Sequence, residues 1–320
     1  LVFISTDKGR TWKKSATLDG QFWSNLFVHR GILFLMGTDK EHGNLIIRRS
    51  EDRGNTWSSP IDSITGLLRT GEYHTAPMPI ISYRGRIWRA VECARSNTDI
   101  WGKRYSAMII SAPDSADLLQ AASWSVTDSL PYDSTYLDGK FGAWLEGNAV
   151  VTPDGNVADL LRVDYAPGPE YAALIRLCDS VSFDPFDPEK DFVRMPGGAK
   201  KFTVRYDSLS GRYWSLVNYV TQEWAGKQNP AWVRNTLALS SSPNLQEWTV
   251  HRTVLHHPDI AKHGFQYADW LFDGNDIVLL SRTAYDDNGT GAHNCHDANY
   301  MTFHRIKDFR KALTEQAGNR

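Results

Sequence analysis

Five times along the chain, an apolar run is followed by a short turn containing glycine and then by a second apolar run. Two apolar runs joined by such a turn are typical of an antiparallel β-hairpin. The sequence therefore predicts five hairpins, over residues 26–37, 79–92, 149–163, 202–218 and 268–283. Helical periodicity is strong only near the end, where residues 308–316 are predicted to form a short helix.

The hairpins begin about 50 to 70 residues apart, which is the spacing of blades in a β-propeller with loops of variable length. Residues 1–12 look like the outer half of one more blade. We therefore predict an all-β, six-bladed β-propeller with an incomplete first blade, and a five-bladed propeller is the alternative. No linker-like stretch divides the chain, so residues 1–320 are predicted to form a single β-propeller domain.

A second repeat has the sequence S-x-D-x-G-x-T-W and occurs at residues 5–12 and 50–57. In such a turn the Asp carboxylate accepts hydrogen bonds from backbone N–H groups, and the Gly supplies a positive φ. A degenerate third copy, at residues 241–248, keeps only the Ser and the Trp. We expect these turns on the outer rim of the blades, with Trp12 and Trp57 largely buried.

Paired boxes of this kind on a propeller pattern resemble the sialidase superfamily, in which they are called Asp boxes or BNR repeats. The resemblance runs from about residue 22 to residue 304 and implies a sialidase-like glycoside hydrolase. It implies that Tyr267, which opens the last hairpin, is the nucleophile and that Glu146 accepts its proton. It also implies that Arg162 and Arg234 belong to a group of arginines that binds the substrate carboxylate.

The chain departs from the sialidase pattern in its first part. No Arg-Ile-Pro motif is present, and the first arginine of the group and the general-acid Asp would belong to the incomplete first blade. Guanidinium groups bind carboxylates through two parallel hydrogen bonds. The expected substrate is therefore a glycan that contains an acidic sugar, without a strict requirement for sialic acid.

Five polar residues that open successive inner strands of the predicted blades are expected to converge: His74, Glu146, Arg162, Arg234 and Tyr267. A second polar cluster lies near the C-terminus: Arg282, Tyr285, Asp286, Asp287, His293, His296, Asp297 and Asn299. The candidate catalytic residues are Tyr267, Glu146 and His74, and the candidate substrate-binding residues are Arg162, Arg234, Arg282, His293, His296 and Asp269.

The loop 286–291 is expected to fold over the channel mouth and to hydrogen-bond sugar hydroxyls. A metal site in this region is the less favoured alternative, and we expect neither a metal nor a cofactor. The His-rich run 256–263 is interpreted as a loop between blades.

Two other functions stay open. A polysaccharide lyase for uronic-acid polymers would use an Arg to neutralise the uronate, and His74 or a Tyr to remove the C5 proton. The other is a non-catalytic glycan-binding propeller, which an activity screen would distinguish from an enzyme. Four tryptophans lie in loop-like, polar contexts, and one or two of them are expected to stack on sugar rings: Trp101, Trp144, Trp224 and Trp232.

Composition and charge limit the classes of binding partner that we expect. The net charge is -2 and no long basic run is present, so a nucleic-acid partner is not expected. The longest apolar stretches have four or five residues, whereas a bilayer span needs about 20. Three cysteines without CxxC spacing predict neither a disulfide framework nor a structural zinc site. We expect a secreted or periplasmic monomer, its signal peptide not in this chain, with a glycan as partner.

Overall fold

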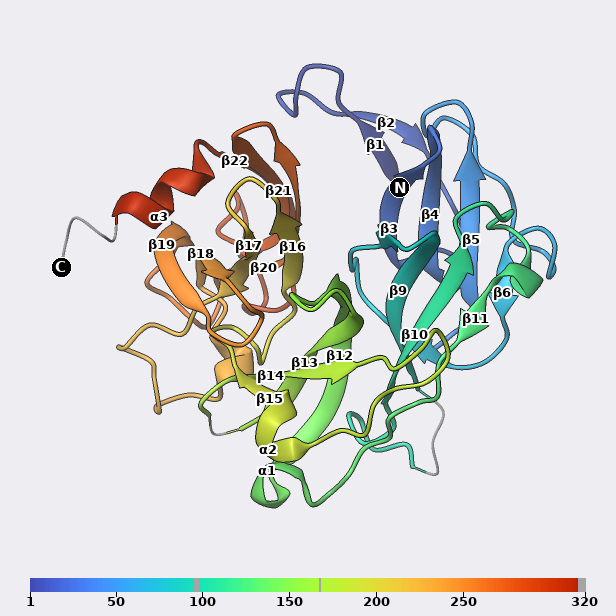
Figure 1. Cartoon of the computed structure of the whole chain (residues 1–320). Coiled ribbons are helices and arrows are strands. Elements are labelled where there is room, and N and C mark those ends of the chain that lie inside the picture. Colours follow the sequence, from blue (N-terminus) through green and yellow to red (C-terminus); the bar gives the residue numbers. More distant parts are fainter. Residues whose placement is uncertain (95–97, 167, 316–320) are drawn as a thin grey trace. The chain divides into compact units, whose positions relative to one another are not determined.

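The computed structural model describes residues 1–94, 98–166 and 168–315 (Figure 1). The chain divides into two compact units. The first consists of Leu1–Tyr132, Leu145–Ala149 and Leu177–Asp184, and the second of Asp133–Trp144, Val150–Arg176 and Pro185–Arg320. Both units are built mainly from antiparallel strands.

The first unit contains three sheets. Two short strands form a sheet of their own, β1 (Val2–Ile4) and β2 (Lys13–Ala16). A four-stranded sheet has the order β3-β4-β5-β6, with β3 (Phe22–His29), β4 (Ile32–Thr38), β5 (Leu45–Ser50) and β6 (Leu67–Arg69). A five-stranded sheet has the order β11-β10-β9-β7, with β8 also paired to β9. Its strands are β7 (Tyr73–His74), β8 (Ile81–Tyr83), β9 (Arg86–Cys93), β10 (Ser106–Pro113) and β11 (Ser125–Val126), which follows the short helix η1 (Ala121–Ser123).

The other sheets lie in the second unit, apart from the middle of β12, which belongs to the first. The sheet β12-β13-β14-β15 contains β12 (Phe141–Val151), β13 (Val157–Tyr165), β14 (Tyr171–Arg176) and β15 (Phe192–Arg194). The sheet β16-β17-β18-β19 contains β16 (Thr203–Asp207), β17 (Arg212–Asn218), β18 (Thr236–Ser242) and β19 (Thr249–His256). The sheet β20-β21-β22 contains β20 (Gly264–Asp273), β21 (Asp276–Ala284) and β22 (Tyr300–Ile306). Short helices connect the strands: α1 (Tyr136–Gly139), α2 (Pro188–Asp191), η2 (Pro230–Trp232), η3 (Phe309–Lys311) and α3 (Ala312–Glu315).

The five predicted hairpins are confirmed as the strand pairs β3–β4, β8–β9, β12–β13, β16–β17 and β20–β21. Their turns show why the prediction succeeds. Arg30 and Gly31 have φ values of 50° and 78°, and a two-residue hairpin turn requires positive φ at both central residues. The predicted terminal helix corresponds to η3 and α3, and its last residue, Gln316, lies outside the described residues.

The number of blades differs from our main prediction. Apart from the pair β1–β2, the described chain forms five sheets of three to five strands, which agrees with the five-bladed alternative and not with six blades. The strands β1 and β2 have only three and four residues, and no further strand joins them in the described part of the chain. A two-stranded pair of this size does not make a blade, which needs inner strands as well.

The two S-x-D-x-G-x-T-W boxes form the same network of hydrogen bonds. In the second box, Asp52 Oδ1 accepts from the backbone N–H of Thr56 at 2.8 Å, and Asp52 Oδ2 accepts from the Thr56 hydroxyl at 2.7 Å. The indole N–H of Trp57 donates to Gly54 O at 3.1 Å. Trp12 makes the equivalent bond but is 43% exposed, so the prediction that it is largely buried was wrong. No other strand of the described residues joins the pair β1–β2, so the indole stays partly uncovered.

The core is divided among several clusters of buried side chains. One cluster, around Met36, Ile47 and Val91, lies in the first unit, and two others, around Phe202 and Trp270, lie in the second. Trp144 is fully buried and packs against aromatic rings of the second unit, so our placement of this residue in a polar loop was wrong.

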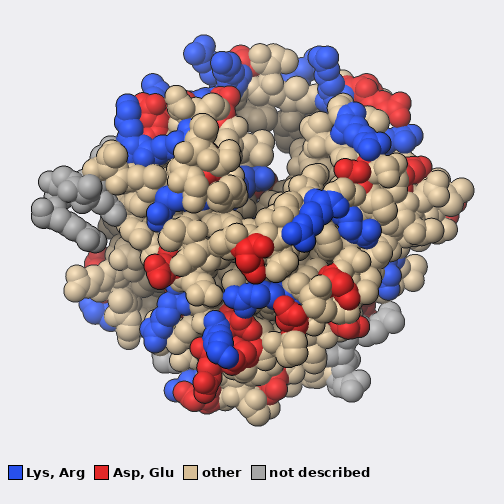
Figure 2. All heavy atoms as spheres, viewed as in Figure 1, with Lys and Arg blue, Asp and Glu red and all other residues tan. Residues whose placement is uncertain are grey.

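The described chain contains no helix long and apolar enough to cross a membrane. On the face drawn in Figure 2, Lys and Arg residues are interspersed with Asp and Glu residues.

Candidate functional site

Three residues with strained backbones occupy equivalent places on the first strands of three sheets. Trp23 on β3, Glu146 on β12 and Tyr267 on β20 have φ values of 41°, 33° and 51°. Each is followed by a small residue and then by Asn or Asp. In β3 and β20 the strand pairing shifts register at this point. Such conformations cost about 1–3 kcal/mol each and are found mainly at functional sites.

In the first unit, His74 is held by a buried carboxylate. Its Nδ1 lies 2.8 Å from Oε2 of Glu92, and Glu92 itself is fully buried. The register pairs His74 on β7 directly with Glu92 on β9. The other oxygen of Glu92 accepts a hydrogen bond from the backbone N–H of Gly147 at 3.0 Å. A carboxylate can only accept, so the neutral His74 ring carries its proton on Nδ1 and has the lone pair on Nε2.

Aromatic rings surround His74. The rings of Trp23 and Tyr105 each have their centres 4.7 Å from the ring centre of His74. The hydroxyl of Tyr105 lies 2.9 Å from Nε2 of His42, a second imidazole of the same cluster. Burial lowers the pKa of His42, and the positive charge of Arg104 lowers it further. A neutral His42 can accept a hydrogen bond from the Tyr105 hydroxyl.

Charged groups affect the phenol of Tyr105. Burial raises the pKa of the Tyr105 phenol; the charge of Arg104 opposes the rise, whereas the carboxylates of Glu92 and Glu146 add to it. Both carboxylates therefore lie close enough to Tyr105 to affect it. Together with His74 they form a group in which a base is oriented by a carboxylate and a second carboxylate lies nearby, which is suited to proton transfer.

In the second unit, two arginines lie close to the ring of Tyr267. The Cζ atoms of Arg282 and Arg234 are 4.9 and 5.8 Å from the centre of the Tyr267 ring. Arg234 donates from Nη1 to the side-chain oxygen of Gln266 at 2.8 Å and from Nε to Ala231 O at 2.9 Å. These neutral acceptors hold the plane of the guanidinium group.

Two further cations extend this group. Lys200 is fully buried, and burial lowers its pKa; Glu170, to which it is hydrogen-bonded, opposes this change, and the charges of Arg234 and Arg162 add to it. The charges of Arg162 and Arg234 therefore act on the Lys200 ammonium. Arg162 is buried and donates from Nε to Ala199 O at 2.9 Å. We refer to Arg162, Lys200, Arg234 and Arg282 as the cationic cluster.

The loop between β21 and β22 contributes His296 to this part of the second unit. The His296 ring centre lies 6.1 Å from that of Tyr267 and 6.3 Å from that of Trp232, which is 53% exposed. The backbone oxygen of His296 accepts hydrogen bonds from Arg282 and Gln266, both at 2.7 Å. An exposed indole beside polar groups is a suitable surface for a sugar ring.

The remaining two candidates lie in different surroundings. The His293 side chain is 87% exposed, and its nearest acidic partner is Asp297, 3.4 Å away. Asp269 forms an ion pair with Arg205 at 3.3 Å and accepts a hydrogen bond from the N–H of Trp270. The structure therefore brings Tyr267 together with Arg234, Arg282 and His296. Asp269 instead forms its ion pair with Arg205, which was not a candidate site residue.

Several residues of these clusters were not singled out from the sequence: Glu92, Tyr105, His42, Gln266 and Lys200. Glu92 lies at the end of an apolar strand. In the sequence alone, a charged residue that is buried and paired at such a position cannot be distinguished from one that is exposed to solvent. The triplets Trp23-Ser24-Asn25, Glu146-Gly147-Asn148 and Tyr267-Ala268-Asp269 were the available signal, because their shared pattern coincides with the strained positions.

A cavity of about 700 Å³ lies elsewhere in the first unit, lined by residues that include Asp19, Asp39 and Arg48. Arg48 donates to the backbone oxygens of Asp19 and Ser58 and to the side chain of Gln21. The hydrogen bonds of the Arg48 guanidinium group therefore stabilise the surrounding loops. The cavity contains none of the strained residues or of the cationic cluster, and we assign no chemistry to it.

No family model and no curated protein matches this sequence. Solved structures do. An α-L-arabinanase of Penicillium chrysogenum, solved with arabinobiose, has a TM-score of 0.56 and 14% identity over 97% of this chain and 85% of its own. A family 117 glycoside hydrolase of Zobellia galactanivorans has a TM-score of 0.51 and 12% identity, covering 94% and 88%. Trypanosoma rangeli sialidase also has a TM-score of 0.51 and 12% identity, and covers 93% of this chain but 48% of its own.

The fold is that of glycoside-hydrolase β-propellers. The likeness extends to several kinds of these enzymes and does not single out the sialidases.

Proposed function

We propose that this protein is a glycoside hydrolase that acts on a glycan containing an acidic sugar. The observation that carries the proposal is the pair of arginines beside Tyr267, which belong to the cationic cluster. Arg282 and Arg234 both lie against the Tyr267 ring, and the charges of Arg234 and Arg162 act on Lys200, whose ammonium is paired with Glu170. In the described part of the chain no carboxylate pairs with Arg282, whose hydrogen bond goes to a backbone oxygen. Such a site favours a substrate group with negative charge, and a sugar carboxylate fits the fork of a guanidinium.

The fold supports the hydrolase reaction. The solved structures that resemble this chain include an arabinanase, a family 117 glycoside hydrolase and a sialidase. They share little sequence with it, so the inference from them concerns the class of reaction, and the residues that carry it come from the site itself.

In the proposed mechanism Tyr267 Oη attacks the anomeric carbon as the glycosidic C–O bond breaks, Glu146 takes the phenol proton, and the departing oxygen leaves as an alcohol after taking a proton from water. A second water then hydrolyses the bond between Tyr267 and the sugar, and the phenol regains its proton. A phenol is a weak nucleophile until a base removes its proton. A tyrosine also avoids placing a bare carboxylate against the negative charge of the sugar, which is the reason for this departure from the usual pair of carboxylates in glycosidases. The strained backbone at both residues supports this assignment.

The test is an analysis of the products formed from acidic glycans. Hydrolysis adds the elements of water across the glycosidic bond, and mass spectrometry of the products detects this gain. Tyr267→Phe removes one hydroxyl and should abolish hydrolysis while substrate binding is kept. Glu146→Gln should slow turnover by about 10²–10⁴. Wild-type turnover in Tyr267→Phe would show that this residue is not the nucleophile.

A second candidate function is a polysaccharide lyase for uronic-acid polymers. The observation that favours it is the pair of His74 and Glu92, with the aromatic ring of Tyr105 beside the imidazole. A histidine with its lone pair fixed on Nε2 is suited to remove the C5 proton of a uronate. A lyase product contains a new double bond that absorbs ultraviolet light and has gained no water. Loss of activity in His74→Ala, together with full activity in Tyr267→Phe, would favour this reaction.

A further inference from the structure

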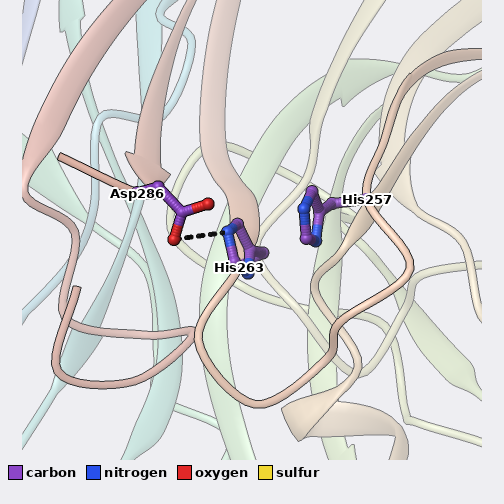
Figure 3. A group of neighbouring side chains, drawn as sticks. All are labelled: His257, His263 and Asp286. Atoms are coloured by element: carbon purple, nitrogen blue, oxygen red, sulfur yellow. Dashed lines mark ion pairs between the residues drawn. The ribbon is translucent and has the colours of Figure 1, made fainter. Parts of the chain in front are cut away.

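Three potential metal ligands meet in the second unit, apart from the residues discussed so far. They are His257 and His263, on the loop between β19 and β20, and Asp286, just after β21 (Figure 3). One ligand atom from each of the three lies within 4.8 Å of the other two. Two imidazoles and one carboxylate form a ligand set that suits Zn²⁺ and similar divalent transition-metal ions.

His263 provides the strongest indication. Its side chain is 5% exposed, and Nδ1 lies 2.9 Å from Oδ2 of Asp259. Asp259 accepts the Nδ1 proton, so the lone pair of the neutral ring is on Nε2. This Nε2 atom is buried and makes no hydrogen bond in the described part of the chain. A carboxylate that fixes a histidine in this way, with the other nitrogen directed at an ion, is the usual support of a metal-binding histidine.

Asp286 lies on the open side of this group. Its Oδ1 is 3.5 Å from Nε2 of His263, and its side chain is 76% exposed. Ligand atoms around a tetrahedral ion lie about 3.4 Å apart, so Asp286 already has the spacing that an ion would require. Because the side chain is exposed, it can adjust to the ion at little cost.

His257 must turn to complete the site. Its ring now lies face to face with that of His263, with ring centres 3.5 Å apart and planes 16° apart. A metal ion lies in the plane of each imidazole ring that binds it. Two rings that are stacked face to face therefore cannot both bind the same ion. His257 is half-buried, and the hydrogen bond from Asp259 N–H to its Nδ1, at 3.1 Å, would be lost or rearranged when the ring turns.

We propose that His257, His263 and Asp286 bind one divalent transition-metal ion, with Asp259 as the positioning residue of His263. The ion would join the loop before β20 to the segment after β21. That segment leads to His296, which lies beside Tyr267, and Cys295 N–H already donates to Ala261 O at 2.7 Å. The metal would therefore fix the loop that carries His296.

The test is titration of the purified full chain with Co²⁺ and with Zn²⁺. Four-coordinate Co²⁺ has a characteristic visible absorption, and we expect it to develop to one equivalent and to disappear when Zn²⁺ is added. Asp286→Asn and His263→Gln should abolish the signal. Asp259→Asn should weaken binding by about 10–100-fold, the usual effect of removing the partner of a ligating histidine.

His293→Gln is the matched control, because His293 is an exposed histidine with an aspartate neighbour on the same loop. It should bind Co²⁺ like the wild type. Circular dichroism of each variant shows whether it is folded, and Asp286→Asn, at an exposed position, serves if His263→Gln does not fold. A wild type without Co²⁺ uptake would overturn the proposal. Equal uptake by the wild type and Asp286→Asn would also overturn it. Neither result depends on catalytic activity.

Discussion

At the scale of single residues, the clearest feature is that charged and titratable groups are held by specific partners. Glu92 accepts from His74 and from Gly147 N–H, and so fixes which nitrogen of His74 carries the proton. Arg282 is held by a backbone oxygen instead of an acid, which leaves its charge available to a substrate. Each of these arrangements predicts what a single substitution does.

Glu92→Gln should change which ring nitrogen of His74 carries the proton. A Gln amide can present its NH₂ group to Nδ1, and the imidazole then carries its proton on Nε2. Nitrogen NMR of the histidine side chains distinguishes the two tautomers directly. If His74 is the base of the reaction, turnover should fall by about 10²–10⁴ in the same variant. An unchanged His74 tautomer would contradict the role given to Glu92.

Arg282→Gln should weaken the binding of an acidic glycan. The amide keeps a donor for the His296 oxygen but loses the positive charge beside Tyr267. KM for the acidic substrate should rise by about tenfold or more, since charge-assisted hydrogen bonds contribute roughly 1.5–3 kcal/mol. Arg305→Gln is the control, because Arg305 pairs with Asp273 and Asp276 in a surface ion pair. Equal KM values for Arg282→Gln and the wild type would argue against carboxylate binding at this arginine.

At the scale of elements, hairpins were predictable because their turns are local. Turn residues such as Arg30-Gly31 determine the backbone within a few positions, and apolar runs on both sides supply the strands. The pairing of His74 with Glu92 was not predictable, because it depends on which residue of β7 faces which residue of β9. The metal-ligand group was missed for a similar reason, since its residues come from two loops that meet only in the folded chain. Trp12 was misjudged because burial depends on the strands around a box and not on the box itself.

The boxes themselves predict a dependence of stability on pH. Hydrogen bonds from Thr56 lower the pKa of Asp52 from 3.8 to about 2. A group whose pKa is lower in the folded chain stabilises the fold above its unfolded pKa, and this contribution is lost as the pH falls toward the folded pKa. The free energy of unfolding should therefore decrease between about pH 4 and about pH 2. Asp52→Asn has no charge to titrate, so urea unfolding over this range should show a shallower decrease. A decrease of the same depth in the variant would mean that other carboxylates are responsible.

At the scale of the whole molecule, the sheets and the solved structures that resemble them describe a propeller fold used by several glycoside hydrolases. The fold alone does not choose among their substrates. We propose that the choice comes from the cationic cluster of the second unit, which favours an acidic sugar over a neutral one. Arg162 and Arg234 were named as candidates from the sialidase resemblance and Arg282 from a polar cluster near the C-terminus, whereas Lys200 and its pairing with Glu170 needed the folded structure.

The most direct test of the account is the hydrolysis of an acidic glycan compared with that of the same glycan after its carboxyl groups have been reduced to alcohols. The two substrates have the same linkages and differ only in charge. If the cationic cluster binds the sugar carboxylate, kcat/KM should be higher for the acidic glycan by about 30-fold or more, the effect expected when a buried charge loses its partner. Equal values of kcat/KM for the two glycans, or the absence of any hydrolysis product, would contradict the central claim.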